Sequence, residues 1–266
     1  MVLDYDKFDL KNKVVVIVGS AGLLGKNYSF TLSKAGANVI LADLNFSECK
    51  KMQNELKKKF GVDPLAIKVD ITKKESIQKM VKKIMKKYSR IDVLINNAIF
   101  PEGPKERSLG FENFSLSVWN KVISVNLTGV FLCCQEIGKL MVKQKSGNII
   151  NISSIYGLTG ADQRIYGKSK LNSSPAYAVT KSGILNFTRY LASYWHDKGI
   201  RVNTLSLGGV ENHQDSTFIK NYSYKTMLGK MAKADDYSGP ILFLASDASS
   251  YMTGSNLIAD GGWTAW

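Results

Sequence analysis

The sequence predicts an α/β fold in which a parallel sheet is doubly wound, with helices on both of its faces. Two observations carry this prediction. Seven short apolar runs recur along the 266 residues, and longer amphipathic stretches separate most of them. Most of the runs are continuously rich in Val and Ile and do not alternate with polar residues, which is typical of parallel strands buried on both faces. Repeated strand–helix–strand units of this kind form a doubly wound sheet.

The seven apolar runs are the predicted strands. They cover residues 13–19, 37–42, 65–69, 91–96, 147–152, 200–206 and 256–259. Stretches such as 45–60 and 74–88 are long enough for crossover helices. The chain shows no linker, internal repeat or Pro/Ser-rich break, so we expect residues 1–266 to form a single domain. Two polar segments, 157–174 and 209–233, follow strands and are expected to face a substrate, because ligands of such sheets bind beyond the carboxyl ends of the strands.

Composition and charge exclude several classes of protein. Hydrophobic residues make up 44% of the chain, which excludes a disordered protein. No apolar run reaches the roughly 18 residues that span a bilayer, and the first residues lack the apolar stretch of a signal peptide. We therefore expect a cytoplasmic protein with no membrane partner. The two histidines form no cluster with the three cysteines, so no metal site is expected.

A net charge of +14 could indicate that the protein binds nucleic acid. Only five of the 36 basic residues are arginine, which is the better bidentate ligand of phosphates and bases. The lysines cluster where solvent-facing sides of helices are expected. The charge is therefore interpreted as a solvated surface, and no nucleic-acid partner is expected.

A glycine-rich turn follows the first predicted strand. Gly19, Gly22 and Gly25 recur at every third position, where the strand passes into a helix. Glycine permits the tight turn and lets backbone N–H groups approach a pyrophosphate at the helix N-terminus. In the first strand–helix–strand unit this pattern predicts a Rossmann-type dinucleotide site, with a tight turn that binds no ligand as the alternative. Ala21 and Leu24 lie in the same turn and are predicted cofactor contacts.

Carboxylates end the second and third predicted strands. Asp43 is placed to accept hydrogen bonds from both hydroxyls of the adenosine ribose. Neither Gly22 nor Leu44 offers a cation that would neutralise a 2′-phosphate, so we expect NAD rather than NADP, unless Asp43 only caps the next helix. Asp70 either contacts the adenine or caps the helix that follows it, and Ile71 beside it is a further predicted cofactor contact.

A tyrosine and a lysine four residues apart can supply the chemistry of hydride transfer. The oxygen on the reacting carbon needs a proton acceptor, and a tyrosine can act as one if its pKa falls from about 10 toward neutrality. Lys181 follows Tyr177 by four residues and shares its helix face, where a cation would stabilise the phenolate. A serine at the end of an adjacent strand, Ser154 or Ser153, can hold the substrate oxygen.

Several motifs in order along the chain resemble the short-chain dehydrogenase/reductase family. They are the glycine turn, Asn96-Asn97-Ala98, Asn126, Ser153-Ser154, Tyr177-Ala178-Val179-Thr180-Lys181 and Asp260-Gly261-Gly262. The resemblance covers residues 11–263. It implies the following roles: Tyr177 is the general acid/base, Lys181 modulates its pKa and binds the nicotinamide ribose, Ser154 binds the substrate oxygen, and Asn126 organises a proton-relay water. It also implies cofactor contacts at Asn97, Ala98 and Val210.

A second tyrosine–lysine pair competes with the first. Tyr166 precedes Lys170 by four residues and lies 12 residues after Ser154, close to the spacing usual in the family. A proline soon follows Lys170 and favours a helix boundary there, whereas an amphipathic helix follows Lys181. We therefore assign Tyr177 to catalysis. This choice predicts an insertion of about ten residues between Ser154 and Tyr177, beside the active site.

These features predict an NAD-dependent oxidoreductase that moves a hydride between nicotinamide and a hydroxyl or ketone carbon of a small polar molecule. The insertion and the segment around Ser154 are similar to family members associated with flagellin or surface-sugar modification, which favours a sugar or nucleotide sugar. Arg164 and His213, in the two polar segments, are candidate substrate contacts.

Two other functions are kept as alternatives. A 3-oxoacyl-carrier-protein reductase is disfavoured by Asp43, because such reductases resemble NADP users. A non-catalytic dinucleotide-binding scaffold would typically lack the tyrosine or the lysine. The helices that carry Asn126 and Tyr177 resemble the subunit interfaces of the family, so a homotetramer or homodimer is expected.

Overall fold

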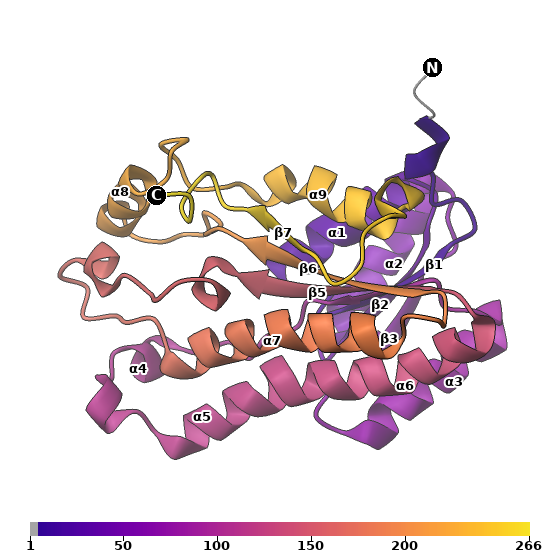
Figure 1. The fold of residues 1–266 in the computed structure, drawn as a ribbon, viewed down its shortest axis with the longest axis horizontal. Helices are drawn as coiled ribbons and strands as arrows, with labels where there is room; N and C mark the ends of the chain where they lie inside the picture. The colour runs from indigo at the N-terminus through magenta and orange to yellow at the C-terminus, as the bar shows by residue number, and fades with distance from the viewer. Residues whose placement is uncertain (1–4) are drawn as a thin grey trace.

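The computed structural model describes residues 5–266, and a seven-stranded parallel sheet forms its centre (Figure 1). The strands are β1 (Val14–Val18), β2 (Asn38–Asp43), β3 (Leu65–Lys68), β4 (Val93–Asn96), β5 (Gly147–Ser154), β6 (Ile200–Leu207) and β7 (Asn256–Ala259). Their order in the sheet is β3-β2-β1-β4-β5-β6-β7, and each neighbouring pair is parallel. The predicted fold class is confirmed, and the strand ends differ from prediction by at most two residues.

Helices cover both faces of the sheet. Helices α1 (Leu23–Lys34), α2 (Phe46–Phe60) and α9 (Ser238–Ala245) pack on one face, and α3 (Lys74–Tyr88), α6 (Gly129–Gln144) and α7 (Pro175–Tyr194) pack on the other. Both faces of the sheet are apolar. In β1, Val15 and Ile17 point into the core on one face, and Val16 and Val18 point into the core on the other. The helices bury one stripe each and turn most of their lysines outward, with Lys181 on α7 as a buried exception.

Helix α3 illustrates this division. Its apolar residues Ile77, Met80 and Ile84 recur at intervals of three and four and are buried. The intervening lysines, such as Lys82 and Lys83, lie on the side that faces away from the sheet. The lysine runs of the sequence are therefore the outer faces of helices, as predicted.

One long helix contains a local irregularity near the site. It begins as α5 (Leu116–Ile123), passes through a π-helical turn (Ser124–Thr128) and continues as α6. The whole span, Leu116–Gln144, is long and apolar enough to cross a bilayer. A core helix of a globular fold can have the same length and hydropathy. In this structure the span packs against α3 and α7 and belongs to the helical layer below the sheet in Figure 1.

The register of the sheet brings the predicted site residues to one edge. Val18 pairs with both Ala42 and Asn96, so the segments that follow β1, β2 and β4 begin side by side. The chain leaves β1 for β2 on one side and reaches β4 on the other, and this reversal opens a crevice at the carboxyl ends of the strands. Ser154 reaches the same edge at the end of β5.

Both polar segments gather beyond this edge. The segment 157–174 contains a short 3-10 turn, Gln163–Tyr166, which contacts α8 (Ser216–Tyr224) of the segment 209–233. The short helix α4 (Pro104–Arg107) lies at the same end of the molecule, on the left of Figure 1. These segments form the outer wall of the site.

Candidate active site

The glycine-rich turn connects β1 to α1, and packing requires two of its glycines. Gly19 has a φ of +82°, and a Cβ added there would lie 2.6 Å from the Cα of Ala98. A Cβ on Gly25 would lie 2.1 Å from the carbonyl oxygen of Gly19. The same oxygen is the nearest atom to a Cβ on the exposed Gly22, at an ordinary 3.6 Å. Gly22 therefore leaves the approach to the N-terminus of α1 clear of side-chain atoms.

Asp43 ends β2 and joins this strand to the glycine turn. Its carboxylate accepts the Ala21 N–H at 3.0 Å and the Asn45 N–H at 2.9 Å. The cap of α2 is Asn45, whose side chain accepts the Glu48 N–H, so Asp43 is not the cap of this helix. Asp43 thus holds a carboxylate beside the glycine turn, and the adjacent Leu44 side chain is exposed.

Asp70 is bound to the chain that follows β3. One of its carboxylate oxygens accepts the Thr72 N–H at 3.0 Å and the Thr72 hydroxyl at 2.6 Å. Burial raises the pKa of this carboxyl, but the bonds from Thr72 and the charge of Lys73 outweigh it and lower the pKa. The local turn therefore already engages one oxygen of Asp70. The side chain of Ile71 is buried against Gly129 and belongs to the core.

The predicted contacts that follow β4 and β6 border the same turn. The Asn97 side-chain amide donates to the Gly19 carbonyl at 2.9 Å, and Ala98 packs on Gly19. Leu24 and Val210 line the cavity that also holds the tyrosine–lysine pair. Apart from the core side chain of Ile71, the structure gathers the residues predicted to bind the cofactor along this edge of the sheet.

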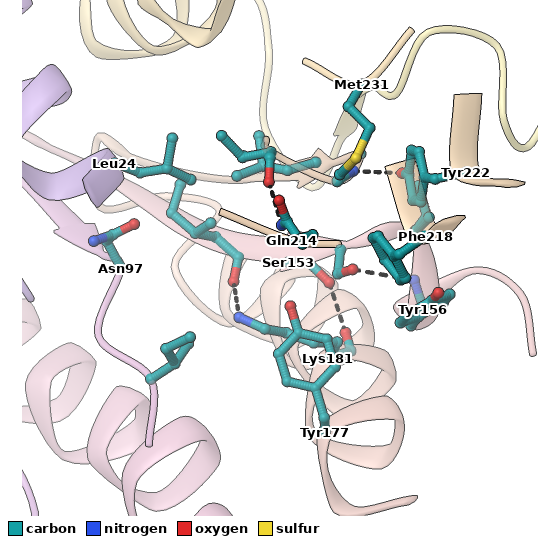
Figure 2. A pocket seen from close by; sticks show the side chains of 18 of the residues that line it. Leu24, Asn97, Ser153, Tyr156, Tyr177, Lys181, Gln214, Phe218, Tyr222 and Met231 are labelled. Atoms are coloured by element: carbon teal, nitrogen blue, oxygen red, sulfur yellow. Dashed lines mark hydrogen bonds between the residues drawn. The ribbon is translucent and has the colours of Figure 1, made fainter. Parts of the chain in front are cut away.

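The cavity at this edge holds the predicted catalytic side chains and has a volume of about 250 Å³ (Figure 2). Tyr177 and Lys181 lie on α7, and the Lys181 Nζ is 5.5 Å from the centre of the Tyr177 ring. The Ser154 hydroxyl accepts the Tyr156 N–H at 3.2 Å and lines the same cavity as Tyr177. The Ser153 hydroxyl instead donates to the Lys181 carbonyl oxygen at 2.8 Å, so the geometry separates the two serines.

Burial governs the protonation of this group. Lys181 is 3% exposed and donates to the Ile152 carbonyl at 2.8 Å, and its burial lowers its pKa to about 8. Burial also raises the pKa of Tyr177; the Ser154 hydroxyl opposes this rise, and Tyr166 and Glu102 add to it. The expected lowering of the Tyr177 pKa is therefore not observed, because desolvation is the largest effect on this phenol.

Asn126 lies in the π-helical turn and is buried. Its side-chain oxygen accepts the Phe100 N–H at 2.7 Å, and its amide nitrogen donates to the Thr180 hydroxyl at 3.5 Å. Thr180 lies between Tyr177 and Lys181 on α7. Asn126 thus connects the long helix, the loop after β4 and the helix that carries the tyrosine–lysine pair.

The competing tyrosine, Tyr166, lines the cavity, whereas the candidate substrate contacts Arg164 and His213 are not among the described residues of its lining. The turn that contains Tyr166 ends there, and Lys170 has a φ of +60°, so these two residues share no helix. The Tyr166 ring nevertheless lines the cavity. The Arg164 side chain is 88% exposed and pairs with Asp162 at 2.8 Å, and His213 is also exposed. Neither is among the described residues that line the cavity.

Sequence reasoning missed the aromatic wall of the cavity. Tyr156, Phe218 and Tyr222 belong to it, with Met231 beside them (Figure 2). The Tyr166 ring lines the same cavity. The Gly209 N–H donates to the Tyr222 hydroxyl, and the Trp263 ring stacks on Tyr222 with 4.3 Å between centroids. The C-terminal tail therefore supports the site of its own chain. The helical spacing of Phe218 and Tyr222 was the one signal that could have indicated an inward apolar face.

The chain is similar to known proteins over almost its whole length. The sequence model of a family described as enoyl-(acyl carrier protein) reductase matches residues 21–264. The post-translational flagellin modification protein A of Campylobacter coli is 33% identical over 254 residues, which make up 96% of this chain and 99% of that protein. The similarity thus extends over the sheet, the glycine turn and the outer wall of the site.

Solved structures are also similar to this chain over almost its whole length. A short-chain dehydrogenase from Leptospira borgpetersenii, solved with bound NAD+, is 36% identical with a TM-score of 0.85, over 99% of this chain and 97% of that one. A gluconate 5-dehydrogenase from Burkholderia cenocepacia, solved with NADP and tartrate, is 26% identical with a TM-score of 0.87, over 98% of both chains. A nicotinamide cofactor is common to both structures, in its two forms.

Proposed function

The chain belongs to the short-chain dehydrogenase/reductase family, and from this premise we propose that it is an NAD-dependent oxidoreductase of a polar substrate, a sugar or nucleotide sugar. Oxidation or reduction of a hydroxyl or keto group with a nicotinamide cofactor is the activity of its relatives. The observation that carries the proposal is the convergence of Ser154, Tyr177 and Lys181 in one cavity beside the glycine turn. We propose that residues 1–266 act as a single domain.

The residues at the glycine turn fit a dinucleotide. The N–H groups at the start of α1 would hold the pyrophosphate, which Gly22 leaves room to approach. Asp43 would hold the adenosine ribose, and Lys181 the nicotinamide ribose. Bound nicotinamide supplies the hydride acceptor or donor. NAD is favoured because Asp43 would repel a 2′-phosphate, and Lys26 on α1 is already paired with Glu48 at 2.7 Å.

The side chains of the cavity would move the proton. During oxidation Tyr177 takes the proton of the substrate hydroxyl while the carbinol C–H bond breaks, and during reduction it returns the proton. Ser154 hydrogen-bonds the same substrate oxygen. The Lys181 cation lowers the cost of the phenolate, and Asn126 holds α7 in place through Thr180. Because Tyr177 is buried and its pKa is raised, oxidation should become faster as the pH rises.

The substitution Tyr177→Phe tests the proposal. It removes only the hydroxyl, so we expect turnover to fall by about 10²–10⁴-fold, the usual contribution of general acid–base catalysis. NAD+ binding, measured by calorimetry, should stay close to wild type. The matched control is Tyr251→Phe, which makes the same change at a fully exposed residue. Wild-type turnover in Tyr177→Phe would contradict the enzyme proposal and favour the scaffold.

We also propose that the protein is a homo-oligomer, built through the outer faces of α6 and α7. Phe131 on α6 and Val179, Tyr190 and Tyr194 on α7 are large apolar or aromatic side chains exposed there. Tyr190 and Tyr194 stack on each other with 5.9 Å between ring centroids. Contiguous exposed apolar surface of this kind marks an interaction site.

A further inference from the structure

We propose that the cavity selects an uncharged, polyhydroxylated ring of monosaccharide size, and that Tyr166 is a specificity-determining residue that the insertion carries into the cavity. The inference rests on the proposed function and narrows its substrate. Three observations support it: the way in which the insertion is held, the charge of the cavity wall, and the size of the cavity.

The insertion is fastened on two sides, so that Tyr166 has a defined position. On one side the Asn172 N–H donates to the Arg107 carbonyl at 2.7 Å. On the other side the Asn221 amide of α8 donates to the Ile165 carbonyl at 3.2 Å. The buried Tyr166 ring lies between these supports, 5.2 Å from the Phe218 ring and 5.4 Å from the Arg107 guanidinium carbon. Packing on both sides fixes the position of the ring in the cavity wall.

The wall that Tyr166 completes is largely aromatic and carries phenol hydroxyls but no charged side chain among its described residues. Tyr156 and Tyr166 both line the cavity, and each phenol can donate and accept hydrogen bonds. Of the described residues that line the cavity, Lys181 alone is charged, and it is bound to the Ile152 carbonyl. Hydroxyl groups suit such a wall, because they exchange hydrogen bonds with phenols without needing a counter-charge.

A carboxyl group and a guanidinium, those of Glu102 and Arg107, lie behind the wall, and neither residue lines the cavity. Burial raises the pKa of Glu102, and the charge of Arg107, whose guanidinium carbon is 5.4 Å from the centre of the Tyr166 ring, opposes this rise. A phosphate or carboxylate on the substrate would find no free cation among the described side chains that line the cavity.

The volume of the cavity suits a small ring. Its volume of about 250 Å³ is below the roughly 300–1,000 Å³ usual for sites of drug-sized ligands. Part of that space adjoins Leu24 and Val210, where the nicotinamide is proposed to lie. Tyr222 lines this cavity, and the Trp263 ring stacks against it. A single ring fits this space better than a nucleotide sugar or a long acyl chain.

A matched substrate series tests the charge and the size together. Free hexoses and hexitols are compared with their own phosphate esters, with hexuronates and with nucleotide sugars, each with NAD+. We expect kcat/KM for the best neutral compound to exceed that of its anionic derivatives by at least about tenfold. A tenfold preference for a phosphate, uronate or nucleotide sugar would overturn the inference and leave the proposed NAD-dependent sugar oxidation intact. Turnover of a 3-oxoacyl thioester alone would overturn both.

The substitution Tyr166→Phe tests the residue itself. The ring and its packing remain, so the variant should fold, and only the hydroxyl is lost. We expect KM for the neutral substrate to rise roughly threefold to tenfold with kcat within about twofold of wild type, the effect of one lost neutral hydrogen bond. Tyr224→Phe is the control, an exposed tyrosine on α8. NAD+ affinity should be the same in both variants. Equal KM values for the two variants would show that Tyr166 does not select the substrate.

Discussion

Lys181 is the buried cation of the site, and its burial predicts a dependence of stability on pH. Its pKa is about 8 in the folded protein, below the ordinary value of 10.5. Between these pH values the unfolded chain holds more protons, so this group makes the fold more stable as the pH rises. Lys181→Met lacks this gain. The unfolding free energy of the variant minus that of wild type should therefore fall by roughly 2–3 kcal/mol from pH 7 to pH 10. Urea titrations at both pH values measure this, and a constant difference would contradict it.

Asp43 is the residue on which the cofactor preference depends. Asp43→Ser keeps an oxygen near the Ala21 N–H and removes the negative charge that would repel a 2′-phosphate. We expect the ratio of kcat/KM for NAD+ to that for NADP+ to fall by at least about tenfold, which corresponds to about 1.4 kcal/mol. Asp197→Ser makes the same charge change at an exposed carboxylate and should leave the ratio unchanged. An unchanged ratio in Asp43→Ser would mean that another feature sets the preference.

Single residues were predictable where their role depends on local spacing. Tyr177 and Lys181 share a helix face because they are four residues apart, and Ser154 ends a strand whose apolar run is plain in the sequence. The pKa of Tyr177 was predicted wrongly because its direction depends on burial by distant parts of the chain. Glu102 was missed for the same reason, since only the fold brings its loop near Tyr177.

At the scale of elements, the strands were predictable and the irregular segments were not. A strand buried on both faces must be a continuous apolar run, so its ends are visible in the sequence. The π-helical turn Ser124–Thr128 has no comparable signature, because it differs from an α-helix by one residue in its hydrogen-bond spacing. The packing of the insertion was also hidden, since its contacts with α4 and α8 join residues far apart in the chain.

The ion pair between Asp162 and Lys225 is expected to limit local opening of the segment 158–170. It joins the insertion to the end of α8 at 2.5 Å, and the bonds from Arg164 and Lys225 hold the pKa of Asp162 well below its usual range. The pair is therefore intact at neutral pH and is lost only as the pH falls below the ordinary range of an aspartate. We expect Asp162→Asn to speed amide hydrogen exchange across residues 158–170 at pH 7.

The same experiment distinguishes local opening of residues 158–170 from a loss of stability of the whole fold. The pair is partly exposed, so the global free energy of unfolding should fall by no more than about 1 kcal/mol, and exchange in β1 and β4 should not change. Asp197→Asn, which breaks an exposed pair with Lys198, is the control and should leave residues 158–170 as they are. Unchanged exchange in Asp162→Asn would show that hydrogen bonds alone fasten the insertion.

At the scale of the whole molecule, helix α7 connects the site to the proposed subunit interface. Its inner face carries Tyr177 and Lys181, and its outer face carries the stacked pair Tyr190 and Tyr194. A partner subunit that packs on the outer face would hold the helix against the sheet and so steady the tyrosine–lysine pair. Assembly and activity should therefore weaken together when the outer face is changed.

The double substitution of Tyr190 and Tyr194 by Glu tests this coupling. Two carboxylates that face their own copies across a two-fold axis would repel each other and would have to be desolvated, so the assembly should dissociate at micromolar concentration. Light scattering coupled to size exclusion measures the mass, and turnover at the same concentration should fall with it. Tyr251→Glu places a charge on a fully exposed residue and should change neither value. A wild-type monomer, or a dissociated variant with full activity, would show that α7 positions its catalytic face without a partner.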